Sequence, residues 1–279
     1  MGIVLQFAQR MPASVLVRLG RLRYTSPRLR PLLDWASRPL QRGEATIRQG
    51  MGRGLRFDPS GGNPGYAVGA VAMAEQQLLG RMLKPGQTFY DIGANVGFFA
   101  VIGAKLVGPG GRVYAFEPFP NSVAAIRANA ARNAFSNVTV VEAAVGRTSG
   151  DGMFRLDGAS AEFGLIPRGQ PAPADALRVS VVCVDDLVLG HTPLAPPDVI
   201  MIDVEGGEID VLHGMARTIA RHQPIIVCEV HGRVVEFANA CAEVCKGLGY
   251  RITQLDGSPL SQDPHTRCHV LMLPRLAAS

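Results

Sequence analysis

Short apolar runs alternate with helical patterns over most of this chain. The first run, residues 87–93 (QTFYDIG), reads as a strand, and residues 98–107 (FFAVIGAKLV) read as a largely apolar helix lying against a sheet. The same order recurs along the sequence. Further strands are predicted at 111–118, 138–146, 198–206 and 224–232, with a possible extra strand at 179–187. This alternation predicts parallel strands joined by helical crossovers.

The later helices and the end of the chain complete the pattern. One helix is predicted from the shared face of Ile209, Leu212, Met215 and Ile219, and another around Phe237 ends at Gly247 and Gly249. The last two strands, 250–256 and 269–275, are separated only by a loop and should pair antiparallel. The predicted fold class is therefore α/β, with a doubly wound, mostly parallel, Rossmann-like sheet and a C-terminal antiparallel hairpin. Its ligand crevice should lie beyond the carboxyl ends of the strands.

Charge separates the amino-terminal part from the rest. The chain has a net charge of +5, but residues 1–56 hold 11 Arg against Asp34 and Glu44, which leaves +9 there and −4 in the remainder. Prolines interrupt this stretch, so we expect short amphipathic helices. We predict a basic helical appendage over 1–56 and an enzyme domain over 57–279. The appendage could contact a membrane peripherally, or it could be a solvated arm or a lid over the site.

Cysteine content and the amino terminus bear on the compartment. The five cysteines are odd in number and scattered without a CxxC pair, which argues against both a disulfide framework and a structural zinc. No apolar run approaches the roughly 20 residues that span a bilayer, and no secretory signal is evident. We expect a cytoplasmic protein.

The strongest chemical signal is a glycine loop between the first strand and its helix. It reads Asp91-Ile92-Gly93-Ala94-Asn95-Val96-Gly97, and the next strand ends in Glu117-Pro118, where doubly wound domains place a carboxylate for ribose hydroxyls. A nicotinamide dinucleotide would need a GxGxxG cradle for its pyrophosphate, whereas this loop reads GANVG. S-adenosylmethionine, which carries no phosphate, fits better; an NAD-dependent oxidoreductase is the alternative. The predicted cofactor residues are Asp91, Gly93, Ala94, Asn95, Gly97, Glu117, Pro118 and Glu142.

The chain resembles the FkbM family of S-adenosylmethionine-dependent methyltransferases from about Tyr66 to His231. The resemblance rests on FYDIGANVGFFAVIGAKLVGPGGRVYAFEP, NAARNAFSNVTVVEAAVG, DVIMIDVEGGEIDVLHG and PIIVCE. It implies the methyltransferase fold and O-methylation of a hydroxyl on a sugar, glycan or natural product. It also implies that residues 203–206 are the family's acidic signature. Where such sequences commonly have a lysine two positions before the aspartate, this chain has Met201.

Four polar side chains at the ends of adjacent strands are the candidates for catalysis. Asp203 and Glu205 follow one strand, and Glu229 and His231 close the next, so all should face the crevice. One of them could remove the hydroxyl proton; clustered carboxylates that hold Mg²⁺ are the competing mechanism, and we assign no metal ligand. For Glu208 and Asp210 a place in the first turn of a helix is sufficient explanation.

Nucleic acid is not an expected partner. The fourth strand leads into DVEGGE rather than the Asp/Asn-Pro-Pro-aromatic loop of amino-directed enzymes, and the basic segment lacks interleaved stacking aromatics. The expected partner is a small-molecule or glycan acceptor.

Overall fold

The computed structural model describes residues 26–41, 43–154, 176–261, 263 and 266–275, together with the single positions 11, 15, 18 and 22. The described helices are α3 (Arg30–Ser37), α4 (Met73–Met82), α5 (Phe98–Val107), α6 (Pro120–Arg132), α7 (Val184–Leu189), α8 (Glu208–Gly214), α9 (Ala216–His222) and α10 (Val234–Val244), with short 3-10 turns η1 (Arg38–Leu40) and η2 (Pro64–Ala67). The described strands are β1 (Ala45–Thr46), β2 (Arg56–Phe57), β3 (Thr88–Ile92), β4 (Arg112–Phe116), β5 (Val138–Val141), β6 (Ala144–Val145), β7 (Gly150–Phe154), β8 (Leu177–Val182), β9 (Val199–Ile202), β10 (Ile225–His231), β11 (Arg251–Gln254) and β12 (Arg267–Leu273).

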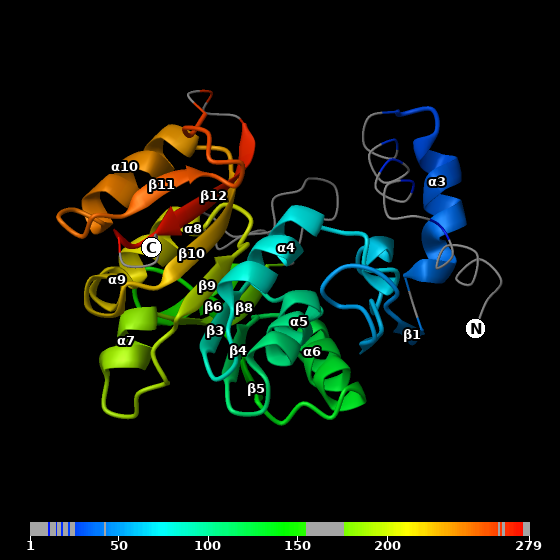
Figure 1. The fold of residues 1–279 in the computed structure, drawn as a ribbon, viewed down its shortest axis with the longest axis horizontal. Helices are drawn as coiled ribbons and strands as arrows, with labels where there is room; N and C mark the ends of the chain where they lie inside the picture. The colour runs from blue at the N-terminus through cyan, green and yellow to red at the C-terminus, as the bar shows by residue number, and fades with distance from the viewer. Residues whose placement is uncertain are drawn as a thin grey trace.

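A seven-stranded sheet in the order β11-β12-β10-β9-β3-β4-β5 forms the centre of the molecule (Figure 1). β5, β4, β3, β9 and β10 are parallel, and β12 lies antiparallel to both β10 and β11. The predicted doubly wound sheet with a closing antiparallel hairpin is therefore confirmed. The strand order reverses between β3 and β9, so the carboxyl ends of these two strands open onto the crevice expected at such a switch point.

Both faces of the sheet are covered by helices because its central strands are apolar on both sides. On one face, Tyr90 and Ile200 pack with Leu212, Ile219 and Phe237 from α8, α9 and α10. On the other, strand residues including Phe89 and Val199 pack with side chains of α4, α5 and α6. These two layers fix the strand ends, and with them the loops that carry the candidate site.

The predicted domain boundary between residues 56 and 57 falls inside a hairpin. β1 pairs antiparallel with β2, and Ile47, Leu55 and Phe57 are buried in one cluster with Phe98 and Ile102 of α5. Residues from Ala45 onward thus pack on the core of the enzyme domain. The expected short helices of the appendage are represented by α3, and the remaining expectations for 1–25 fall mostly outside the described residues.

Three predicted elements are each divided in the structure. The strand expected at 138–146 ends at Val141 and resumes as β6 in a separate three-stranded sheet, β6-β8-β7. The possible strand at 179–187 becomes β8 followed by α7. The helix after β9 divides at Met215, since the buried carboxylate of Asp185 accepts the N–H groups of Arg217 and Thr218 at the start of α9.

The cysteines agree with the sequence analysis, because all five are free and buried. No helix within the described residues is long and apolar enough to cross a membrane.

Candidate active site

The glycine loop between β3 and α5 brings two distant strand ends into contact. Gly93 has φ +85°, and a Cβ on it would lie 1.9 Å from the backbone oxygen of Asp203, which follows β9. Gly97 also has φ +85°, in the region that glycine adopts without strain. The two glycines let the loop turn tightly against β9. The loop that was expected to hold a cofactor and the loop expected to carry catalytic acids are therefore adjacent.

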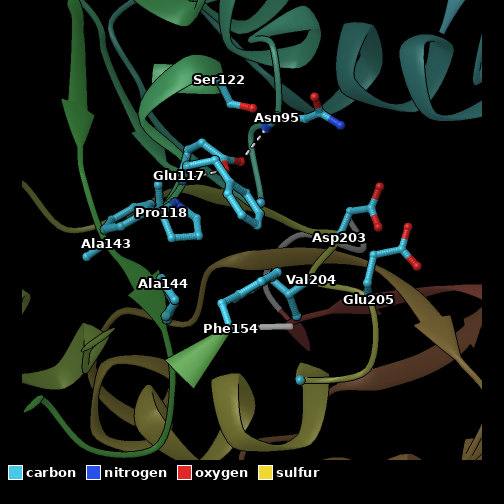
Figure 2. Close-up of a pocket in the computed structure, with 15 residues that line it drawn as sticks. Asn95, Glu117, Pro118, Ser122, Ala143, Ala144, Phe154, Asp203, Val204 and Glu205 are labelled. Carbon is cyan, nitrogen blue, oxygen red and sulfur yellow. Dashed lines mark hydrogen bonds between the residues drawn. The ribbon is translucent and has the colours of Figure 1, made fainter. Parts of the chain in front are cut away.

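Glu117 lies just beyond the end of β4 and is hydrogen-bonded to the glycine loop. Its Oε2 accepts the Asn95 N–H at 2.8 Å and its Oε1 accepts the Phe119 N–H at 3.0 Å. The side chain is 4% exposed. Each carboxylate oxygen keeps a further lone pair for a ligand hydroxyl. Figure 2 shows this carboxylate on one side of the pocket, with its hydrogen bond to Asn95 drawn.

A cavity of about 330 Å³ lies between these elements. Glu117 lines one side, and Asp203 and Glu205 line the other (Figure 2). Phe119 and Phe154 meet edge to face, with ring centroids 4.7 Å apart. The remaining lining residues are Gly93, Asn95, Phe116, Pro118, Ser122, Ala143, Ala144, Val145, Val204 and Gly207. The cavity thus combines an apolar wall with carboxylates at two sides.

Three carboxyl groups at the crevice, those of Asp91, Glu117 and Asp203, have raised pKa values. Burial and the nearby charges of Asp203 and Glu117 raise the pKa of Asp91 to about 8, and burial raises the pKa of Glu117 to about 7. Burial and the charge of Glu229 likewise raise the pKa of Asp203 to about 7. Oδ2 of Asp91 and Oδ1 of Asp203 are buried without a hydrogen-bond partner among the described residues. This arrangement favours a bound cation.

A second group of charged side chains lies beside the first, at the ends of β10 and β12. The strand register places Glu229 opposite His269 and His231 opposite Arg267. Arg267 Nε lies 2.6 Å from a Glu229 oxygen, and His269 Nε2 lies 3.4 Å from the other. His269 Nε2 also lies 3.0 Å from Glu75, which α4 supplies. Here the protein provides its own cations.

His231 is held by carboxylates on both ring nitrogens. Its Nδ1 lies 2.8 Å from Glu208 Oε1, and its Nε2 lies 3.1 Å from Glu205 Oε2 and 3.7 Å from Asp203 Oδ1. Burial opposes the charged ring, but the hydrogen bond with Glu208 and the charge of Glu205 raise the pKa of His231 above its ordinary value. Glu208 is 3% exposed and also accepts the Gly206 N–H at 2.8 Å.

The same cluster offers three potential metal ligands. One ligand atom each from Asp203, Glu205 and His231 lies within 4.8 Å of the others. The guanidinium of Arg267 contacts both Glu205 and His231 at this place. Positive charge is therefore available here without a metal ion.

Of the predicted site residues, those that line the cavity are Gly93, Asn95, Glu117, Pro118, Asp203 and Glu205, whereas Asp91, Ala94 and Gly97 belong to the adjoining strand and loop without lining it. Glu142 follows β5, but its exposed carboxylate pairs with Arg127, and only the next residues, Ala143 and Ala144, line the cavity. The break between β5 and β6 turns Glu142 outward, so the structure does not bring it to the cofactor loop. Glu229 and His231 lie behind Asp203 and Glu205 rather than among the lining residues.

Sequence reasoning missed four contributors. Glu208 was interpreted only through its place at a helix start, which holds for Asp210, whose exposed side chain pairs with Arg147. Glu75, Arg267 and His269 were assigned nothing. Arg267 and His269 are two residues apart on an otherwise apolar strand, as Glu229 and His231 are on theirs. This shared spacing indicates that the four side chains could lie on one face of paired strands.

The strand order and the glycine loop, with an acid on the next strand, define a Rossmann-like methyltransferase fold. The chain belongs to the FkbM methyltransferase family, because residues 91–252 match the Methyltransferase FkbM domain. Over 51 residues it is 51% identical to 31-O-demethyl-FK506 methyltransferase FkbM of Streptomyces tacrolimicus, which covers 18% of this chain and 19% of that one. Over 164 residues it is 27% identical to hexuronic acid methyltransferase AglP of Haloferax volcanii, covering 57% and 64%.

A crystal structure of methyltransferase FkbM from Methylobacillus flagellatus aligns over 78% of this chain and 56% of that chain, with a TM-score of 0.45 and 16% identity. The chain spans less than two thirds of the length of these two curated relatives.

Proposed function

We propose that this protein transfers the methyl group of S-adenosylmethionine to a hydroxyl group of a sugar, glycan or natural product. The observation that carries the proposal is the set of buried carboxyl groups around the glycine loop. Within the described part of the chain, no Arg, Lys or His forms an ion pair with Asp91 or Glu117, and the pKa of each carboxyl is raised. S-adenosylmethionine carries a sulfonium and an ammonium group, which would supply the missing positive charge.

The residues present fit this cofactor better than NAD. Glu117 is placed to accept hydrogen bonds from ribose hydroxyls, and Phe119, Phe154 and Val145 offer apolar surface for an adenine ring. The pyrophosphate of NAD would bring negative charge to a cleft already crowded with acids. The charge of the cleft therefore argues against the dehydrogenase alternative.

Asp203 is the residue best placed to take the proton of the acceptor hydroxyl. It lines the cavity, its Oδ1 lacks a hydrogen-bond partner, and its pKa of about 7 suits a general base at neutral pH. S-adenosylmethionine, when bound, supplies an electrophilic methyl group. As the hydroxyl oxygen is methylated, its proton passes to the Asp203 carboxylate.

His231 is placed to support this base rather than to replace it. Glu208 holds Nδ1, so that Nε2 faces Asp203 and Glu205. The charged ring would stabilise ionised Asp203 between turnovers. Arg267 and His269 both form ion pairs with Glu229. Because its carboxylate is engaged in this way, Glu229 has a supporting role.

Metal assistance is the second mechanism that the geometry admits, through Asp203, Glu205 and His231. Turnover that survives EDTA supports a direct base, whereas turnover that is lost and then restored by Mg²⁺ supports the metal.

The names of two relatives indicate which acceptors to test first. One is a 31-O-demethyl-FK506 methyltransferase, a name that specifies an oxygen atom, and the other is a hexuronic acid methyltransferase. A hexuronic acid carries both hydroxyl groups and a carboxyl group, so the experiment should compare a sugar hydroxyl with a sugar carboxyl group as acceptors.

Calorimetry with S-adenosylmethionine tests the cofactor assignment. We expect wild type to bind with micromolar-range affinity, and Glu117→Ala to bind about tenfold more weakly or worse, because two backbone N–H groups and the ribose lose their acceptor. Glu142→Ala is the matched control, since Glu142 faces Arg127 outside the cavity. Circular dichroism verifies the fold of each variant. Equal affinity in wild type and Glu117→Ala, or tighter binding of NAD than of S-adenosylmethionine, contradicts the proposal.

A further inference from the structure

Exposed apolar side chains gather at the amino-terminal end of the described chain. Six large hydrophobic side chains are exposed among the described residues, and only Val235 lies in the enzyme domain. The other five lie between positions 15 and 35, and are Val15, Leu22, Leu29, Leu32 and Trp35. Trp35 is the most exposed at 67%, and Leu32 follows at 61%. Among the other described residues only Val235 is a large hydrophobic side chain that is exposed, so this concentration calls for a physical reason.

Apolar and charged side chains lie on different sides of α3. Leu29, Leu32 and Trp35 are spaced by three residues, which places them on one side of the helix. Arg30 and Asp34 share the opposite side and form an i,i+4 ion pair. Arg30 on the charged side is also exposed, so α3 is open to solvent on both sides and its apolar side is not turned onto the protein's own core.

The chain directly after α3 packs on the enzyme domain. Leu40, in η1 directly after α3, packs on Ala45 and Ala67 and also on Val68 and Ala70. Figure 1 shows α3 at one end of the molecule, away from the central sheet. The helix is therefore connected to the enzyme domain through its carboxyl end while its apolar side faces outward.

The charge of the segment selects the partner. Residues 1–56 carry +9, and the remainder of the chain carries −4. A second copy of the same helix would bring like charges together, which opposes self-association through this side. An anionic phospholipid surface offers negative charge and apolar depth together, which suits a helix with Trp and Leu on one side that is flanked by Arg28 and Arg38 in a basic segment. With eight residues α3 is too short to cross a bilayer, so it would lie in the interface.

We propose that α3 forms a docking surface for anionic phospholipid membranes, with Leu32 and Trp35 entering the interface. Because Leu32 and Trp35 are not among the residues that line the cavity, the proposal stands whether or not the assignment of cofactor and acceptor is correct.

Trp35 itself reports on the test, because it is the only Trp in the chain. Full-length protein is titrated with vesicles of phosphatidylcholine alone or with about 30% phosphatidylglycerol, an anionic fraction that gives a negative surface potential. We expect a blue shift of the Trp emission and quenching by brominated lipid only with anionic vesicles. Both should weaken as salt is raised, because salt screens the surface charge.

Variants separate docking from nonspecific adsorption. In co-sedimentation, Leu32→Ser with Trp35→Ser should lower the vesicle partition coefficient roughly tenfold or more, because two interfacial anchors are lost. Val235→Ser changes the exposed apolar side chain of the enzyme domain, and this variant should bind as wild type does. S-adenosylmethionine binding should be unchanged in all variants. An unshifted emission with anionic vesicles, or equal pelleting of the double variant, overturns the proposal. A blue shift that grows with protein concentration in the absence of vesicles points instead to self-association and also overturns it.

Discussion

Two neighbouring groups of carboxylates have pKa values that are shifted in opposite directions. Burial raises the pKa of Asp91 and Glu117 beside the cofactor loop, and nothing in the described protein reverses it. Burial also acts against ionisation of Glu75 and Glu229, yet their pKa values are lowered, because His269, and for Glu229 also Arg267, more than offset it. Burial is common to both groups. The difference lies in the counter-charge, and its absence at the cofactor loop marks where a cationic ligand is expected.

The largest expected effect compares Asp203 with Glu229. Asp203→Asn should lower kcat by about 10²–10⁴-fold, the usual contribution of a general base, and leave S-adenosylmethionine affinity within a few fold. Glu229→Gln should reduce kcat less, because its carboxylate is engaged by Arg267 and His269. Transfer of labelled methyl to an acceptor that wild type modifies measures both. Equal turnover in wild type and Asp203→Asn would remove Asp203 from the mechanism.

His269→Gln tests the compensated group through stability. Burial opposes its charge, but hydrogen bonds and charges from Glu229 and Glu75 raise the pKa of His269 to about 10. A raised pKa gives stability that is fully present below about 6.5 and is lost as pH rises through about 10. At pH 7 the substitution should reduce the free energy of unfolding by about 2 kcal/mol, a figure discounted for partial exposure.

Urea unfolding at pH 7 and pH 10 measures this effect, and the difference from wild type should shrink at the higher pH. His191→Gln, at an exposed position, is the control and should unfold as wild type does. A pH-independent loss would show that packing, not charge, explains the contribution of His269.

The smallest expected effect has the opposite sign, in the uncompensated group. Because the pKa of Asp91 is raised from 3.8 to about 8, its contribution to stability is lost as pH rises between those values. Asp91→Asn cannot ionise, and the ligand-free variant should gain about 1 kcal/mol over wild type between pH 7 and pH 8. Urea unfolding at both pH values tests this. The same ionisation should make S-adenosylmethionine bind wild type more tightly at pH 8 than at pH 6. No change with pH in either measurement would contradict the account of the cleft.

The sequence predicts the frame of the fold and the cofactor loop well for a physical reason. Short buried strands separated by helical patterns leave little choice of topology, and that topology alone brings Gly93, Asn95 and Glu117 to one crevice. The direction of Glu142 could not be predicted in this way. It depends on a break after Val141 that moves the chain into another sheet, and no residue pattern marks that break.

The compensating cations were beyond sequence reasoning for a different reason. Arg267 and His269 reach Glu229 and His231 through the register of two strands that are not consecutive in the chain. Glu75 comes from a helix that precedes the glycine loop. Pairing between elements so far apart is decided by packing, which local periodicity does not specify.

The position of β12 between β10 and β11 has a consequence for biosynthesis. A ribosome releases β10 with its Glu229 and His231 first, whereas Arg267 and His269 arrive only with the final strand. During synthesis the edge of β10 stays unpaired, and Glu229 lacks its cationic partners Arg267 and His269, until β12 inserts between β10 and β11. A chain that ends before Arg267 should therefore bind chaperones more strongly than one that includes β12, because the edge of β10 stays unpaired and Glu229 lacks Arg267 and His269.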